Sequence, residues 1–125
     1  MTDVVVTVPK AIWRDWIEEG DLAGDEWSGM TSHFFIDKRE PRITPGERVY
    51  VVAHGRLRGY APLVKVEHGC RLKPHTLCLM REGGAVALTI PQTVRGFQGW
   101  RYRWWERSEE APFPDWQTSG VDPSR

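Results

Sequence analysis

The chain has little cysteine, no long apolar run and no basic leader segment. Its 125 residues include two cysteines, Cys70 and Cys78, too few for a disulfide framework or a cysteine-based metal site, so we expect two reduced thiols. No stretch reaches the roughly 18 consecutive apolar residues of a membrane-spanning helix. The start, Met1-Thr2-Asp3, lacks the positive charge of a secretory signal. We therefore expect a cytoplasmic protein without a membrane partner.

Sequence motifs for catalysis and cofactor binding are also scarce. The four histidines show no spacing typical of a zinc site, and no glycine pattern of the P-loop or dinucleotide-binding type occurs. Lys38, Glu40 and Arg42 could form a charged trio, but such a run is more commonly a solvated surface. We therefore expect no metal and no cofactor. Binding is favoured over catalysis, with Lys38 and Glu40 as the catalytic candidates to substitute first.

The net charge of zero hides an uneven distribution of charge along the chain. Residues 31–107 hold fourteen Lys and Arg against six Asp and Glu, whereas residues 1–30 hold two basic and seven acidic side chains. Residues 108–125 are acidic again. A basic central region suits a partner that carries phosphate. Arginines on outward strand positions would give the same charge, so both interpretations stay open.

Short β-branched and aromatic segments between Gly- and Pro-rich turns predict a mainly β fold with flanking helices (α+β), built on a mixed β-barrel of about six strands. The length suits one domain. The predicted strands cover residues 3–8, 32–37, 48–53, 56–67, 75–81, 85–90 and 100–107.

One helix and one tail complete the predicted organisation. Ile12, Trp13, Trp16 and Ile17 have helical spacing within residues 10–19, and Gly20 ends this helix. We place the barrel domain at residues 1–108. The acidic, proline-containing residues 109–125 are predicted to form a loosely ordered C-terminal tail.

The most informative segment for function is the predicted strand that begins at Arg56. Strict alternation places Arg56, Arg58 and Tyr60 on one face, with Leu57 and Ala61 on the other. Two guanidinium groups and a phenol on one surface could hold phosphate and stack on a base. An exposed face whose charge discourages aggregation would look the same.

The last predicted strand interleaves basic and aromatic residues. Alternation groups three rings on one face, which we expect in the core, and places the other side chains on a wet face suited to cation–π and stacking contacts. The core face holds Trp100, Tyr102 and Trp104, and the wet face holds Arg101, Arg103, Trp105 and Arg107.

A third candidate is the loop that carries Trp27, Ser28 and Gly29. The chain has seven tryptophans, more than a core of this size commonly needs. Trp27 beside small hydroxyl residues could form one wall of a base pocket, or it could close one end of the barrel.

The order of these segments resembles the PUA-like superfamily, in particular EVE and ASCH domains. The resemblance is carried by Pro45-Gly46-Glu47-Arg48-Val49 at the entry to a central strand, by Arg58-Gly59-Tyr60-Ala61 and by Gly99-Trp100-Arg101-Tyr102-Arg103. It covers residues 3–107 by pattern. It implies a β-barrel flanked by helices, with a cleft that binds RNA or a modified DNA base.

The resemblance also implies positions for the ligand. The EVE-like pocket corresponds here to Pro9-Lys10 and to the Trp27-Ser28-Gly29 loop. The ASCH signature is Gly-x-Lys-x-x-Glu-x-Arg. In this chain Lys38, Glu40 and Arg42 correspond to its Lys, Glu and Arg, but their spacing differs and the glycine is absent. Some ASCH proteins are hydrolases, and this departure from their signature argues against the same activity in this chain.

The leading hypothesis is a nucleic-acid-binding module that recognises RNA or a modified DNA base through a basic, aromatic-lined cleft. Its predicted ligand-binding residues are Lys10, Trp27, Ser28, Gly29, Arg56, Arg58, Tyr60, Arg101, Arg103 and Trp105. The alternative is an ASCH-type hydrolase that acts on RNA or a modified nucleoside and uses Lys38 and Glu40. A third possibility is a protein-interaction module with exposed tryptophans as hot spots.

Overall fold

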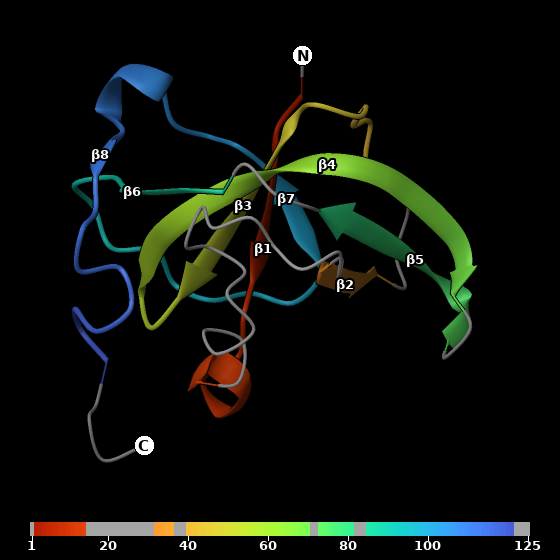
Figure 1. Ribbon diagram of the computed structural model, residues 1–125, viewed down its shortest axis with the longest axis horizontal. Helices are drawn as coiled ribbons and strands as arrows, with labels where there is room; N and C mark the ends of the chain where they lie inside the picture. The colour runs from red at the N-terminus through yellow and green to blue at the C-terminus, as the bar shows by residue number, and fades with distance from the viewer. Residues whose placement is uncertain (1, 15–31, 37–39, 71–72, 82–84, 122–125) are drawn as a thin grey trace.

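The computed structural model describes residues 2–14, 32–36, 40–70, 73–81 and 85–121, and it is mainly β (Figure 1). Two short 3-10 helices, η1 (Lys10–Ile12) and η2 (Arg107–Glu109), accompany the strands. The strands are β1 (Val4–Thr7), β2 (Ser32–Ile36), β3 (Arg48–Ala53), β4 (Arg56–Cys70), β5 (Lys73–Arg81), β6 (Val86–Thr89), β7 (Trp100–Tyr102) and β8 (Ala111–Pro112). In the described part of the chain, no helix has the length and hydrophobicity to cross a bilayer.

The strands form one sheet in the order β2-β5-β4-β3-β1-β7; in addition, β6 pairs with β4, and β8 pairs with β6. The long strand β4 curves across the molecule: its first half pairs with β3 and β6, and its second half pairs with β5 (Figure 1). β1 and β3 are parallel neighbours, and the other pairs are antiparallel. The mainly β prediction is therefore confirmed.

The barrel and its flanking helices are finer predictions that the fold does not show. The end strands β2 and β7 have no pairing with each other among the described residues, so the sheet is open rather than closed. The helix predicted for residues 10–19 is described only through η1 and as far as Arg14.

The central strands β1 and β3 are buried on both faces, which explains their unbroken valine-rich sequences. Side chains on one face of the sheet join the first core cluster, and those on the other face join the second. The first cluster comprises Val4, Val6, Val8, Trp13, Ile43, Val49, Val51, Ala53, Leu63, Leu79, Phe113 and Trp116. The second comprises Val5, Tyr50, Val52, Leu57, Leu88, Ile90, Val94 and Trp105.

A β-bulge interrupts the β3–β4 pairing directly after the turn. His54 and Gly55 both have positive φ, as a two-residue hairpin turn requires. Val52 faces Leu57, but Val51 faces Gly59, so Arg58 is the extra residue on β4. A bulge shifts the alternation of the residues that follow it, so Tyr60 lies on the side of the second core cluster, while Arg58 is buried on the same side as Arg56.

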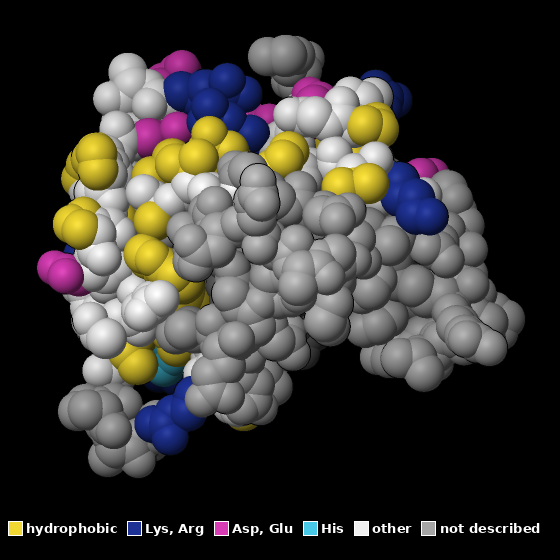
Figure 2. All heavy atoms as spheres, in the orientation of Figure 1, with side chains coloured by type: hydrophobic (Ala, Val, Ile, Leu, Met, Phe, Trp, Pro, Cys, Tyr) yellow, Lys and Arg dark blue, Asp and Glu magenta, His cyan; other side chains and the backbone are white. Residues whose placement is uncertain are grey.

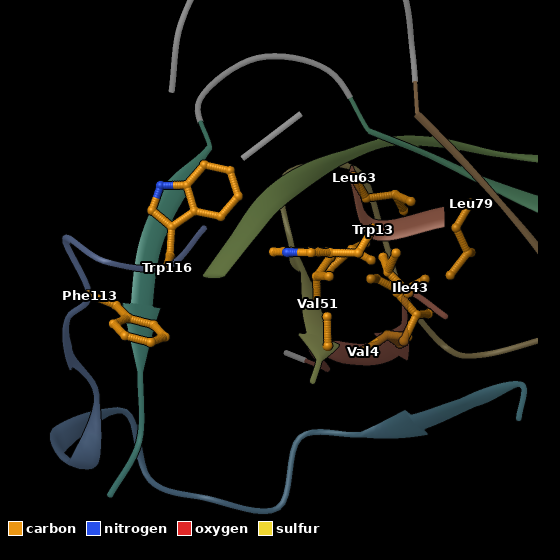
Figure 3. Packing of buried hydrophobic residues seen from close by; sticks show 12 residues of the cluster. Val4, Trp13, Ile43, Val51, Leu63, Leu79, Phe113 and Trp116 are labelled. Carbon is orange, nitrogen blue, oxygen red and sulfur yellow. The ribbon is translucent and has the colours of Figure 1, made fainter. Parts of the chain in front are cut away.

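The segment predicted to be a loose tail instead packs against the domain. β8 pairs with β6, and Phe113 and Trp116 are buried members of the first core cluster (Figure 3). Trp116 contacts Trp13 edge to face, with ring centroids 5.9 Å apart, and Trp13 Nε1 donates to the carbonyl of Gln117. As far as residue 121, this segment belongs to the folded domain.

Candidate functional site

Arg58, a predicted ligand-binding residue, is fully buried, with 0% of its surface exposed. Its guanidinium donates to four carbonyl oxygens, and it lies over the rings of Trp13 and Phe113. The bonds are Nε to Ala53 O (2.9 Å), Nη1 to Trp116 O (3.1 Å) and Ser119 O (2.5 Å), and Nη2 to His54 O (3.3 Å). Burial, with the nearby charge of Arg56, lowers the pKa of Arg58 to about 10. In this structure Arg58 fastens the C-terminal segment to the β3–β4 turn.

Of the three side chains predicted to share one face of β4, the bulge separates Tyr60 from Arg56 and Arg58. Arg56 is half-buried over the Phe113 ring, and its Nη2 donates to Ile90 O at 3.4 Å. Tyr60 packs against the second core cluster, where its ring lies 5.3 Å from that of Tyr50. Arg56 and Arg58 thus lie on one side of β4 and Tyr60 on the other, so the predicted common face does not extend past the bulge to Tyr60.

The basic and aromatic segment after residue 95 is also arranged differently from its prediction. β7 ends at Tyr102, so alternation does not continue to the neighbouring tryptophans. Trp105, expected on the wet face, is 4% exposed, whereas Trp104, expected in the core, is 49% exposed. Arg101 is exposed as predicted, and Arg103 is half-buried in an ion pair.

The structure describes only some of the other predicted residues. Trp27, Ser28, Gly29 and Lys38 lie outside the described residues. Lys10 is exposed at the start of η1, and Glu40 is exposed beside a small hollow described below. The predicted residues that the structure describes are thus not gathered around one cavity.

A hollow of about 890 Å³ does occur elsewhere, where the chain start meets the loop before β3. We call it the arginine hollow. It is lined by Thr2 and Asp3, by residues 41–48 and by Arg107. A smaller hollow of about 470 Å³ shares Thr2 and Arg42 with it and adds Glu40 and Tyr102. Lys and Arg side chains gather beside Asp and Glu side chains at the end of the molecule where β1 begins (Figure 2).

The loop wall of the hollow is fixed by a turn at Pro45-Gly46. Gly46 has φ of +91°, a conformation that glycine adopts without strain, and Glu47 N–H donates to Thr44 O. The Glu47 carboxylate accepts from both the N–H and the hydroxyl of Thr44, each at 2.8 Å, and from the N–H of Thr2. Burial raises the pKa of Glu47, but these hydrogen bonds outweigh it and leave the pKa below its ordinary value.

The second carboxylate of the hollow, that of Asp3, is hydrogen-bonded to other groups of the chain. Its side chain is 2% exposed and accepts from Arg48 N–H (3.0 Å), Arg103 Nε (3.1 Å) and Arg107 Nη2 (3.0 Å). Burial by itself raises the pKa of Asp3. The bond from Arg48 and the charges and bonds of Arg107 and Arg103 more than offset burial and lower it overall. Both carboxylates thus remain charged and occupied.

The guanidinium groups of the three arginines in the hollow differ in their hydrogen bonds and in their exposure to solvent. Arg48 lies in a buried network, in which its Nη1 donates to Tyr50 OH (2.9 Å) and pairs with Glu110 (3.1 Å). Arg107 is bound to Asp3, but 40% of its side chain is exposed. Arg42 is exposed; its backbone N–H binds Tyr102 OH at 2.9 Å, and its guanidinium has no partner among the described residues.

A comparison with known families places the chain. A family model described as "Protein of unknown function (DUF1489)" matches residues 4–122. The chain belongs to the DUF1489 family. No curated protein and no solved structure matches it.

In this DUF1489 domain, none of the residues that line the arginine hollow is among the predicted ligand-binding residues. The sequence pattern places Arg42 only within a charged trio, and Arg107 only on the wet face of the last predicted strand. Asp3 and Arg107 lie at opposite ends of the sequence and meet only because β1 pairs with β7. One signal was present, since Pro45-Gly46 predicts a turn that holds Arg42 and Arg48 on either side. No cluster of three or more His, Cys, Asp or Glu side chains suited to a metal ion occurs among the described residues.

Proposed function

We propose that this chain is a nucleic-acid-binding module that receives the phosphate backbone at the arginine hollow. One observation carries the proposal: three arginines line a single hollow whose two carboxylates are already engaged by other groups of the chain. The guanidinium of Arg42 is therefore available to an external anion, and Arg107, whose Nη2 binds Asp3, keeps 40% of its side chain exposed.

The chemistry of the hollow favours phosphate. Guanidinium groups donate paired N–H bonds that match the oxygen spacing of phosphate. Arg42 supplies an exposed guanidinium, and Arg107 keeps part of its side chain in solvent. Arg48, which is held in place by Tyr50 and Glu110, adds a third guanidinium to the lining of the hollow.

The resemblance to PUA-like domains belongs to the same proposal and extends it to RNA or a modified DNA base as the ligand. The mainly β sheet with its central β1–β3 pair is compatible with this extension. The predicted pocket at Lys10 and Trp27-Ser28-Gly29 remains a prediction.

The test is oligonucleotide binding measured over a range of salt concentrations. Because each neutralised phosphate releases counterions, log affinity should fall linearly with log salt. Arg42→Ala should weaken binding roughly fivefold at low salt and reduce the slope by about one unit. Lys65→Ala is the charge-matched control, since Lys65 is exposed on β4 and lines neither hollow.

The slope of log affinity against log salt concentration and the affinities of the two variants together test the proposal. If the chain binds no RNA or DNA, the proposed function is wrong. If binding occurs but Lys65→Ala and Arg42→Ala weaken it equally, the arginine hollow is not the site.

A further inference from the structure

Two rings and one guanidinium lie together on residues 97–104, where Phe97 is partly buried and packs against the second core cluster. Trp104 is about half exposed, its ring centroid lies 6.4 Å from that of Phe97, and the Arg101 guanidinium lies 4.6 Å over the Phe97 ring. We call Phe97, Arg101 and Trp104 the stacking cluster. The proposed phosphate site does not use these side chains.

Contacts with neighbouring residues hold Trp104 and Phe97 of the stacking cluster in place. Trp104 contacts Trp105 at nearly a right angle, with centroids 5.0 Å apart, and Trp105 is buried and donates to Glu110. Phe97 N–H donates to Thr7 Oγ1 at 3.2 Å, which ties the loop before β7 to the end of β1. A ring fixed in this way can accept a flat ligand with little loss of side-chain entropy.

The stacking cluster and the arginine hollow are joined through β7 and the residues that follow it. Arg103, directly before Trp104, binds Asp3 in the wall of the hollow, and Tyr102 OH accepts from Arg42 N–H. Residues 95–107 carry four arginines and one glutamate. A strand with its phosphates at the arginines would therefore meet the half-exposed ring of Trp104, which follows Arg103 in the chain.

We propose that the stacking cluster binds unpaired nucleobases, so that the ligand is single-stranded nucleic acid rather than a duplex. This inference rests on the proposed function. In a duplex, neighbouring base pairs cover both faces of each base, whereas a single strand can turn its bases onto aromatic side chains. The positive charge around Trp104 favours this ligand over an apolar protein surface, since a protein partner would have to compensate the arginines.

The experiment compares a single strand of about 12 nucleotides, within the usual site sizes of single-strand-binding proteins, with the duplex of the same sequence. Trp104→Ala and Trp104→Leu should each weaken single-strand binding roughly tenfold, because base stacking on one ring is lost. Trp104→Phe should retain most of the affinity. Val86→Ala, which shortens an exposed apolar side chain on β6, is the control and should bind as the parent does.

Failure of this inference can be distinguished from failure of the proposed function. If Arg42→Ala weakens binding with salt dependence while Trp104→Ala and Trp104→Leu bind the single strand as the parent does, phosphate binding stands and stacking is overturned. Stacking is also overturned if the parent binds single strand and duplex with equal affinity. The same holds if Trp104→Leu binds the single strand as tightly as the parent, even when Trp104→Ala does not. If no oligonucleotide binds, both proposals are overturned. Thermal melts of each variant establish that the fold is intact.

Discussion

Arg58 at the β3–β4 turn and Arg42 at the arginine hollow are the same residue type in opposite surroundings. Arg58 is enclosed, and its donors are bound by four carbonyl oxygens of the chain itself. Arg42 is exposed, and its guanidinium contacts no described acceptor. A buried cation whose hydrogen-bonding capacity is spent stabilises the fold, whereas an exposed one with free donors can bind a ligand.

The two regions also differ in the chemistry of their acceptors. The described partners of Arg58 are uncharged carbonyls, which do not titrate. Arg107 and Arg103 at the hollow are bound to a carboxylate, Asp3. The first region should therefore contribute the same stability over a wide pH range, while the second should depend on pH in acid.

The largest expected effect is that of Arg58→Met. Methionine fills part of the space but leaves the carbonyls of Ala53, His54, Trp116 and Ser119 without their donors. Because buried acceptors without partners are costly, the free energy of unfolding should fall by about 3–5 kcal/mol. Denaturant unfolding measures this loss.

The same substitution at Arg42 provides the control for this comparison. Arg42→Met should change the unfolding free energy by no more than about 0.5 kcal/mol, because the side chain is exposed. It should instead reduce nucleic-acid binding. Similar stability losses in the two variants would contradict the division of the arginines into structural and ligand-binding groups.

Trp116→Ala should have the next largest effect on stability. It removes a buried ring that packs against Trp13 in the first core cluster, and the resulting cavity should cost about 3 kcal/mol. Chemical unfolding again measures the change, with the exposed Trp104→Ala as the size-matched control. Equal losses in the two variants would mean that residues 111–121 do not contribute to the core as the structure indicates.

The sequence predicts the elements whose local signals agree. The predicted strand at residues 48–53 coincides with β3, because a Pro-Gly turn precedes a β-branched run and a two-residue turn follows it. The turn at His54-Gly55 and the start of β4 were also predicted correctly. In each case the neighbouring residues alone determine the structure.

The predictions that failed depend on contacts between distant residues. A single bulge residue reverses the side-chain alternation of β4 beyond Arg58; Gly59, which has positive φ, marks the place in the sequence but not the direction of the side chains. The acidic and proline-rich composition after residue 108 indicated a tail, but Phe113 and Trp116 find a hydrophobic surface formed by β6 and Trp13. The hollow likewise depends on the β1–β7 pairing, which brings Asp3 to Arg103 and Arg107.

Among the substitutions expected to destabilise the fold, Asp3→Asn should have the smallest effect, and this effect should depend on pH. Asparagine keeps an oxygen for Arg48 N–H but loses the charge that holds Arg103 and Arg107. Since both arginines are partly exposed and can regain water, the loss at neutral pH should be about 1–2 kcal/mol.

Folding lowers the pKa of Asp3 below its ordinary value of 3.8, so the stabilisation by its charge is complete above that value and disappears as the pH falls through the lowered pKa. The difference in unfolding free energy between the parent and Asp3→Asn should therefore be constant near neutrality and shrink below about pH 3.8. Glu47 titrates in the same range, but it is present in both proteins and cancels in the difference. The corresponding difference for Arg58→Met should stay constant over this range, because the described acceptors of Arg58 do not titrate. A difference for Asp3→Asn that does not change with pH would show that the charge of Asp3 does not stabilise the hollow.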